Sequence, residues 1–200
     1  MGKRNKKLSR EEKMEVEEWI YQNNTEETRM TDTMTIKVKC KTENQKSLVN
    51  AIKEKEVIVC SGPAGSGKTF LACAEALRLI KRNGRYKKIV IVKSVTTLKN
   101  EEIGFLKGNL REKMEPFMFS FVHNFEKIVG QSITSRLREL KTIEELPIAY
   151  MRGINLDKSV IIVDEAQNIS QENMRTILTR LGKDSKMIFL GDERQQDSKG

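Results

Sequence analysis

The stretch that decides the fold is Gly62-Pro63-Ala64-Gly65-Ser66-Gly67-Lys68-Thr69, which matches the pattern G-x-x-x-x-G-K-[ST] at every fixed position. The apolar run Val57–Cys60 precedes it and predicts a buried strand, and a helical pattern over Lys68–Arg82 follows it. A glycine-rich turn between a strand and a helix offers backbone N–H groups and a positive helix end to a polyanion. We therefore expect this loop to bind the phosphates of a nucleotide.

The last two side chains of the loop carry its expected chemistry. Lys68 places a compact cation on the β- and γ-phosphates, and the Thr69 hydroxyl is a ligand for Mg²⁺. ATP and Mg²⁺ are thus the predicted ligands. The residues expected to hold the nucleotide are Gly62, Pro63, Ala64, Gly65, Ser66, Gly67, Lys68 and Thr69.

A second motif lies at the end of another apolar run. Ser159–Val163 predicts a buried strand that leads directly into Asp164 and Glu165. Ligands of open α/β sheets bind at the carboxyl ends of the strands, so both carboxylates are expected at that edge. We interpret Asp164 as a Mg²⁺ ligand and Glu165 as the base that polarises water for in-line attack on the γ-phosphate. Two acids favour hydrolysis over a small-molecule kinase, which has less need of a water-activating glutamate.

Two further segments are candidates for the same site. Met187–Leu190 predicts a strand followed by Asp192, which could couple to the water or the metal, and by Gln195, which could sense the γ-phosphate. Taken alone, Gly-Asp after a strand is an ordinary turn signal. Upstream, the amide of Gln45 can satisfy the N6 donor and the N7 acceptor of adenine. The same segment, Thr42–Gln45, is also typical of a helix cap.

Strands and helices alternate along the chain beyond the loop. Lys88–Val92 predicts another strand, and the spacing of apolar residues over Met174–Leu181 predicts a helix. This alternation indicates βαβ units and a mostly parallel sheet with both faces covered. The predicted fold class is therefore α/β.

Residues 1–32 are expected to form a basic N-terminal extension that precedes a nucleotide-binding domain over residues 33–200. Within the extension, Ser9–Glu12 has the capping-box spacing, which predicts a short helix ending near Tyr21 and a linker after it. Thr33–Cys40 alternates apolar and polar residues, which predicts a half-buried strand.

The chain of 200 residues has 37 Lys and Arg against 28 Asp and Glu, a formal net charge of +9. This balance suits an anionic partner such as single-stranded RNA or DNA, although solubility alone is the simpler explanation. No apolar run is long enough to span a membrane, and none follows the basic start, so neither a transmembrane nor an ordinary secreted protein is expected. Three cysteines without a CxxC pair fit a reduced cytosolic setting.

Aromatic residues and two arginines leave alternatives open. Four of the seven phenylalanines lie in one short stretch, at Phe117, Phe119, Phe121 and Phe125. The four-residue spacing of three of them predicts a helix face in the core, and stacking on unpaired bases is the alternative. Arg152 and Arg180 are candidates for an arginine that reaches the nucleotide of a neighbouring subunit in a ring, against ordinary ion pairing.

Together these motifs resemble the PhoH family of predicted ATPases, whose nucleotide-binding core is related to that of superfamily one helicases. The resemblance extends from about Lys39 to Asp197. Besides the phosphate loop, its most specific segments are Thr42–Lys46, Gly104–Leu106, Leu110–Pro116, Ala149–Gly153, Val163–Asn168, Leu178–Gly182 and Gly191–Asp192. The resemblance implies a RecA-like, three-layer P-loop NTPase core, ATP binding and RNA-linked roles. Many proteins of this family are encoded by phages, and for those the cytoplasmic location expected from the cysteines is the host cytoplasm.

Two features depart from the family pattern. Relatives usually carry Arg-Pro after the second strand, where this chain has Lys93-Ser94, and Arg and Lys are not interchangeable at a bidentate phosphate contact. A RecA-like sheet normally has a strand beyond the phosphate-loop strand, and no candidate follows Leu190. Either the chain is incomplete at Gly200, or Thr33–Cys40 supplies an edge.

The sequence supports two functions of different classes. The first is a Mg²⁺-dependent ATPase that remodels or unwinds RNA or single-stranded DNA. Because one RecA-like unit cannot walk as a two-domain helicase does, this activity would need a ring or a partner. The second is a nucleotide-gated switch or adaptor that binds a protein without translocating.

Overall fold

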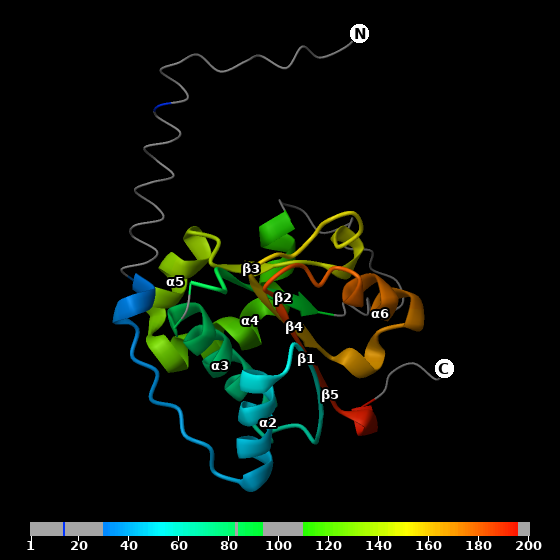
Figure 1. The fold of residues 1–200 in the computed structure, drawn as a ribbon, viewed down its shortest axis with the longest axis horizontal. Coiled ribbons are helices and arrows are strands. Elements are labelled where there is room, and N and C mark those ends of the chain that lie inside the picture. The colour runs from blue at the N-terminus through cyan, green and yellow to red at the C-terminus, as the bar shows by residue number, and fades with distance from the viewer. Residues whose placement is uncertain (1–13, 15–29, 83, 94–109, 196–200) are drawn as a thin grey trace.

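The computed structural model describes residues 14, 30–82, 84–93 and 110–195 (Figure 1). Their strands form one parallel sheet in the order β1-β5-β4-β2-β3, and β5 lies between the phosphate-loop strand and the acidic strand. The strands are β1 (Val57–Ser61), β2 (Lys88–Lys93), β3 (Ile143–Glu145), β4 (Ser159–Asp164) and β5 (Lys186–Gly191). The α/β fold class is confirmed, and the four strands predicted beside the motifs are found with each end within one residue.

Helices connect these strands. The α-helices are α2 (Glu43–Glu54), α3 (Lys68–Arg82), α4 (Leu110–Val129), α5 (Gln131–Glu139) and α6 (Gln171–Leu178). The short 3-10 helices are η2 (Ile148–Tyr150), η3 (Ala166–Asn168) and η4 (Glu193–Gln195). Helix α3 has the predicted bounds, while β3 and α5 were not predicted.

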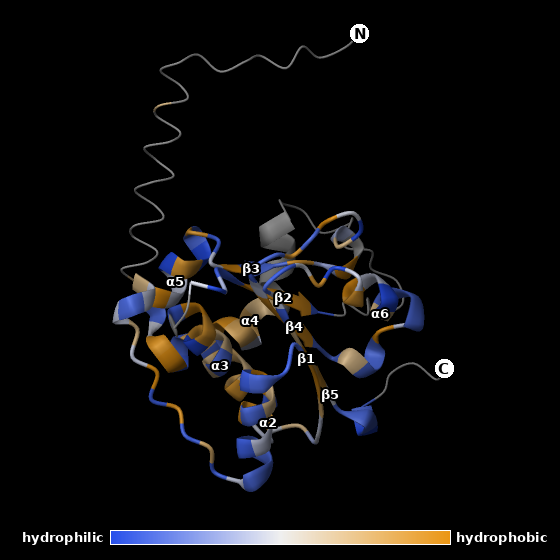
Figure 2. Ribbon diagram, viewed as in Figure 1, coloured by the Kyte–Doolittle hydropathy of each residue, from blue (hydrophilic) through white to orange (hydrophobic). Residues whose placement is uncertain are grey.

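Two apolar layers cover the two faces of the sheet. In β2, Ile89 and Ile91 pack toward the side of α2, α3, α4 and α5, whereas Val90 and Val92 pack toward the side of α6. Successive side chains of a strand point to opposite faces, so both sets are buried and the run contains no polar residue. Figures 1 and 2 show the resulting three layers, with apolar strands between helices. The three-layer prediction is confirmed.

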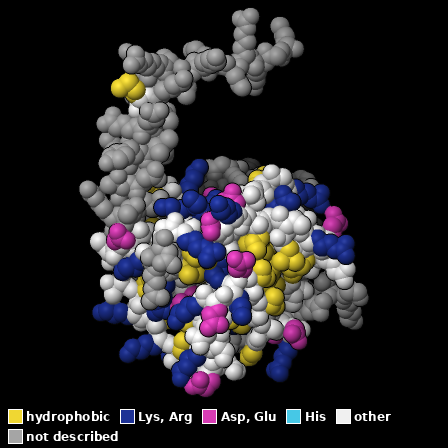
Figure 3. Space-filling model, viewed as in Figure 1, with side chains coloured by type: hydrophobic (Ala, Val, Ile, Leu, Met, Phe, Trp, Pro, Cys, Tyr) yellow, Lys and Arg dark blue, Asp and Glu magenta, His cyan; other side chains and the backbone are white. Residues whose placement is uncertain are grey.

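Strand β1 lies at one edge of the described sheet, and only one of its faces is well covered. Ile58 is 5% exposed, whereas Val57 and Val59, on the opposite face, are 42% and 77% exposed. Figure 3 shows a group of hydrophobic side chains on the visible face of the molecule. Among the described residues, the fifth strand of the sheet is β3, beside β2, and none lies beyond β1.

The prediction of a strand over Thr33–Cys40 is wrong. Met34, Ile36, Val38 and Cys40 do pack against the core, so the apolar alternation is real. The backbone, however, pairs with side chains of α3: Arg78 Nη2 donates to the Val38 carbonyl at 2.7 Å, and Lys81 Nζ to the Met34 carbonyl at 2.5 Å. The segment therefore lies along a helix instead of supplying a sheet edge.

Several other predictions concern parts of the chain that the structure does not describe. The expected helix ending near Tyr21 and the segment Gly104–Leu106 lie outside the described residues. In the part that is described, no helix combines the length and apolarity needed to cross a bilayer. The cysteines Cys40, Cys60 and Cys73 are free thiols.

Candidate nucleotide-binding site

The phosphate loop connects β1 to α3, as its sequence predicts, and its shape depends on glycine. Gly65 and Gly67 have φ angles of 73° and 85°, in the left-handed region that side chains disfavour. Gly67 also passes close to Gln45, whose Nε2 would lie 3.2 Å from a Cβ at this position. A side chain at residue 67 would therefore strain the backbone and push against α2.

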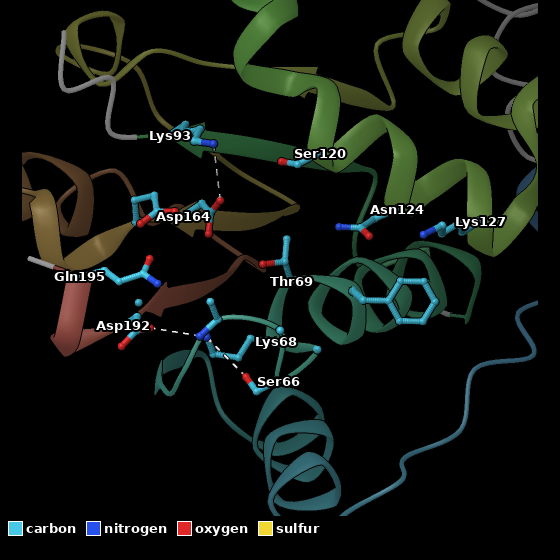
Figure 4. Close-up of a pocket in the computed structure, with 16 residues that line it drawn as sticks. Ser66, Lys68, Thr69, Lys93, Ser120, Asn124, Lys127, Asp164, Asp192 and Gln195 are labelled. Carbon is cyan, nitrogen blue, oxygen red and sulfur yellow. Dashed lines mark hydrogen bonds and ion pairs between the residues drawn. The ribbon is translucent and has the colours of Figure 1, made fainter. Parts of the chain in front are cut away.

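Lys68 lies folded over the loop. Its Nζ donates to the carbonyl oxygens of Gly62 and Pro63 at 2.5 and 2.9 Å, and Ser66 Oγ lies 3.5 Å away. These carbonyls hold the ammonium at the mouth of the loop, where Figure 4 places it beside Ser66. Phosphate oxygens can replace carbonyl oxygens as acceptors, since charge-assisted bonds are the stronger ones.

A cavity of about 780 Å³ opens beside the loop, a volume within the range of small-molecule sites. It brings together residues from four strand ends or loops and from α4. The lining residues are Ala64, Gly65, Ser66, Gly67, Lys68, Thr69, Phe70, Lys93, Ser120, Asn124, Lys127, Asp164, Glu165, Gly191, Asp192 and Gln195. Residues predicted from three separate motifs thus share one cavity (Figure 4), whereas Gly62 and Pro63 line a smaller neighbouring cavity.

Asp164 and Lys93 are register partners at the ends of β4 and β2. Lys93 Nζ lies 4.0 Å from Asp164 Oδ2, and both side chains are largely buried. Burial raises the pKa of the Asp164 carboxyl above its ordinary value, while the Lys93 ammonium lowers it and the neighbouring Glu165 raises it further. The Asp164 carboxylate is therefore already paired with a cation, the Lys93 ammonium.

The donor set fits Mg²⁺. Thr69 and Asp164 offer a hydroxyl and a carboxylate to the same cavity, and Mg²⁺ is typically held by one or two carboxylates together with substrate phosphates and water. Thr69 points into the cavity across from Asp164 in Figure 4. The two residues predicted as metal ligands are therefore brought together.

We expect nucleotide binding in Lys93→Gln to be half-saturated at a Mg²⁺ concentration about three- to tenfold lower than in the unmodified chain. The reason is that an ion pair worth ~1 kcal/mol no longer competes for Asp164. Titration of Mg²⁺ in the presence of a fluorescent ATP analogue measures the effect. Two variants serve as controls: Lys93→Arg, which retains the cation, and Lys183→Gln, which changes an exposed lysine elsewhere. An unchanged Mg²⁺ requirement in Lys93→Gln would contradict the competition.

A hydrogen-bonded network links the acidic motif to the segment after β5. Gln167 Nε2 donates to Glu165 Oε2 at 2.6 Å, and Gln167 Oε1 accepts from the Asp192 backbone N–H at 3.1 Å. Glu165 itself has φ 53° and ψ 41°, an uncommon left-handed conformation for a non-glycine residue. Gln167 therefore holds the side chain of Glu165 in place. Sequence reasoning assigned it no role, although its position two residues after Glu165 was the available signal.

Asp192 contacts the phosphate loop directly. Its Oδ2 accepts from the Ala64 backbone N–H at 3.1 Å, and its side chain is nearly buried. The contact joins the end of β5 to the loop, and the coupling of Asp192 to the water or the metal stays a prediction. Gln195 lines the cavity, and its carbonyl lies 3.4 Å from Gln167 Nε2.

Gln45 lies on the other side of the loop. The helix-cap interpretation is confirmed for Thr42, whose hydroxyl accepts from the Gln45 N–H at 3.2 Å. The Gln45 amide itself donates to the Ser66 carbonyl at 3.0 Å and accepts from the Lys41 N–H at 2.6 Å. A second cavity of about 470 Å³ adjoins it, with Leu48 and Leu71 among its lining residues.

The two arginines lie apart from the described lining of the main cavity. Arg180 Nη1 donates to the Ile154 carbonyl at 3.1 Å, and its other nitrogens face Thr179 Oγ1. Arg152 forms an exposed ion pair with Glu172 at 3.0 Å. Neither contact tests a role toward the nucleotide of another subunit.

Sequence reasoning missed the contribution of α4. Ser120, Asn124 and Lys127 line the cavity from this helix (Figure 4), and their spacing places them on one face. Phe121 and Phe125 are fully buried, which confirms the core prediction for those two. The sequence did contain a signal for this contribution: Ser120, Asn124 and Lys127 are polar, have helical spacing and lie next to an apolar helix face.

Known proteins of one family are similar to this chain in sequence. The sequence model of the family described as PhoH-like protein matches residues 37–200. The chain is 41% identical over 160 residues to the PhoH-like protein of Bacillus subtilis (strain 168), covering 80% of this chain and 50% of that protein. It is 34% identical over 157 residues to Protein PhoH of Escherichia coli (strain K12), covering 78% and 44%. The chain therefore spans about half the length of these relatives.

Likeness in shape to solved structures is more distant. The chain aligns with the Sulfolobus solfataricus SWI2/SNF2 ATPase core in complex with dsDNA at 19% identity and a TM-score of 0.45, over 79% of this chain and 33% of that one. The assignment accordingly rests on the sequence matches, and the range matched by the family model contains the phosphate loop, the acidic motif and the segment after β5. On those grounds, the chain belongs to the PhoH-like protein family.

Proposed function

We propose that this chain is a Mg²⁺-dependent ATPase whose hydrolysis is coupled to single-stranded RNA or DNA. The observation that carries the proposal is the convergence of Lys68, Thr69, Asp164 and Glu165 on one cavity from two segments that lie far apart in the sequence. A phosphate loop, two oxygen donors for Mg²⁺ and a second carboxylate are the parts that hydrolysis of a triphosphate requires.

The residues have distinct roles in this proposal. Lys68 and the loop amides neutralise charge that develops on the transferred phosphoryl group. Thr69 and Asp164 hold Mg²⁺, which when bound offsets phosphate charge. Glu165 accepts a proton from the attacking water, and Gln167 keeps its carboxylate oriented through the 2.6 Å hydrogen bond. Gln195, at the rim of the same cavity, senses the γ-phosphate.

In this proposal, adenine binds in the cavity of about 470 Å³ beside Gln45. That cavity adjoins the loop at Gly62 and Ser66 and has apolar walls at Leu48 and Leu71. Gln45 lines this cavity. Its side-chain amide gives up its present hydrogen bonds to Lys41 and Ser66 and forms hydrogen bonds with the edge of adenine instead. Most described residues of this cavity come from α2 and the loop, and Lys68 lines both cavities.

The nucleic-acid part of the proposal rests on charge and family. The net charge is +9, and Figure 3 shows Lys and Arg side chains spread over the visible face. We place the activity in the cytoplasm, in agreement with three free thiols. A single core needs a ring or a partner to move along a strand, and Arg180 is our candidate for reaching a neighbouring nucleotide within such a ring.

Stimulation of ATP hydrolysis by poly(U) or oligo(dT) at low salt tests the coupling. An increase in turnover with either polymer supports the proposal, and an unchanged rate with both rules out coupling. The second candidate is a nucleotide-gated switch or adaptor, which the bond between Asp192 and the loop favours because it occupies the Ala64 N–H, one of the loop amides expected to face a phosphate. Gel filtration with and without a non-hydrolysable ATP analogue detects a nucleotide-dependent assembly.

A further inference from the structure

Helix α4 presents three different faces. One packs in the core through Met118, Phe121, Phe125 and Ile128. A second lines the nucleotide cavity through Ser120, Asn124 and Lys127 (Figure 4). The third carries two exposed aromatic rings, Phe119 and His123, which belong to neither of the apolar clusters on the sheet.

The two aromatic rings form an ordered pair. Phe119 and His123 lie with ring planes only 7° apart and centroids 6.2 Å apart. Phe119 is 74% exposed, the most exposed of the large aromatic side chains in the described part of the chain. A single exposed apolar residue is common, but parallel rings held by one helix offer flat π-faces without further ordering.

The pair belongs to a row that leads to the nucleotide cavity. Phe119, His123 and Lys127 follow one another at intervals of four residues, so they are neighbours along one side of α4. Lys127 is exposed and also lines the cavity. At ~100° per residue, the aromatic pair lies next to the cavity face and away from the core face. Two rings and a cation thus form a continuous ridge, the α4 ridge, at the cavity.

We propose that the α4 ridge binds single-stranded nucleic acid. An unpaired base stacks on Phe119 and His123, and Lys127 contacts a backbone phosphate, which is the combination of aromatic and cationic groups that unpaired strands bind. The proposal rests on the proposed function and deepens it by naming the surface. It also explains the coupling, because the helix that holds the strand supplies Ser120, Asn124 and Lys127 to the nucleotide cavity.

Substitution of Phe119 tests the ridge. We expect Phe119→Ala to weaken binding of fluorescein-labelled oligo(dT) and oligo(U) roughly 5- to 100-fold, since stacking on an aromatic contributes strongly per base. Phe119→Tyr should retain binding. ATP affinity without a polymer should stay unchanged, because Phe119 does not line the cavity. Tyr150→Ala, which removes another aromatic that is 57% exposed, is the matched control.

A tryptophan at the same position gives a direct readout. Trp19 is the single tryptophan of the chain, so Phe119→Trp combined with Trp19→Phe leaves one reporter on the ridge. Quenching of its fluorescence by added oligo(dT) supports stacking at this site. Far-UV circular dichroism of every variant separates a folding defect from a binding defect.

The outcomes separate the two proposals. If the unmodified chain binds oligonucleotides and Phe119→Ala binds them equally well, the ridge assignment is wrong while the proposed function stands. If the unmodified chain neither binds them nor hydrolyses ATP faster in their presence, nucleic-acid coupling fails and the ridge assignment fails with it. Stimulation that is lost in Phe119→Ala and kept in Phe119→Tyr supports both.

Discussion

Lys68→Ala is expected to lose both ATP binding and turnover, with the affinity falling at least about 100-fold. Each charge-assisted hydrogen bond contributes roughly 1.5–3 kcal/mol, and this ammonium is expected to contact both the β- and γ-phosphates. The substitution also removes the cation that now bridges the Gly62 and Pro63 carbonyls. Equilibrium binding of a fluorescent ATP analogue, together with phosphate release, measures both losses.

The control for Lys68→Ala is an exposed lysine on a neighbouring helix. Lys53→Ala, in the last turn of α2, changes the net charge by the same amount without touching the loop. Urea unfolding of both variants reports whether the loop substitution also destabilises the domain. ATP binding that survives in Lys68→Ala at its original affinity would show that the nucleotide lies elsewhere.

Glu165→Gln is expected to separate binding from hydrolysis. ATP should bind about as tightly as before, while turnover falls by roughly 10²- to 10⁴-fold, because the amide cannot accept the proton of the attacking water. The amide oxygen can still accept the hydrogen bond from Gln167 Nε2, so the local network is expected to persist. Single-turnover hydrolysis, with the protein in excess over ATP and with saturating Mg²⁺, measures the chemical step.

The matched control here is Glu172→Gln, which neutralises an exposed glutamate that pairs with Arg152. It should leave turnover unchanged. Normal turnover in Glu165→Gln would remove the assigned base. If phosphate transfer to a small-molecule acceptor were retained at the same time, the kinase interpretation would gain support.

Much of the sheet could be predicted because its strands are buried on both faces. Val160–Val163 is a continuous apolar run, and such a run next to a polar motif has few alternatives in an α/β protein. Strand β3 was missed because its three residues include Glu144 and Glu145. Lys88 of β2 and Arg138 of α5 pair with these two carboxylates, and Lys88 lies 56 positions away in the sequence, so no local pattern reveals the strand.

The segment Thr33–Cys40 shows the limit of periodicity. The alternation of buried and exposed side chains was predicted correctly, yet the sequence pattern contains no information about what bonds to the backbone. Here the guanidinium of Arg78 and the ammonium of Lys81 satisfy carbonyl oxygens that a neighbouring strand would otherwise satisfy. Buried Glu75 pairs with Arg78 and fixes it in that position.

At the site, motifs located the residues but not their contacts. The loop, Asp164, Glu165 and Gln195 were predicted from local patterns and line one cavity. The ion pair between Lys93 and Asp164 depends on the register of two strands that are separated by 71 positions, which no local pattern encodes. The same is true of the contributions from α4, which follow from how that helix crosses the cavity.

The most direct measurement is a crystal structure of Glu165→Gln with ATP and Mg²⁺. We expect the triphosphate to bind to the loop amides, with the Lys68 ammonium in contact with the terminal phosphates. Mg²⁺ should lie ~2.0–2.1 Å from Thr69 Oγ1, with Asp164 bound directly or through water and Lys93 moved away from its carboxylate. A triphosphate outside the 780 Å³ cavity, or an ion held by neither Thr69 nor Asp164, would contradict it.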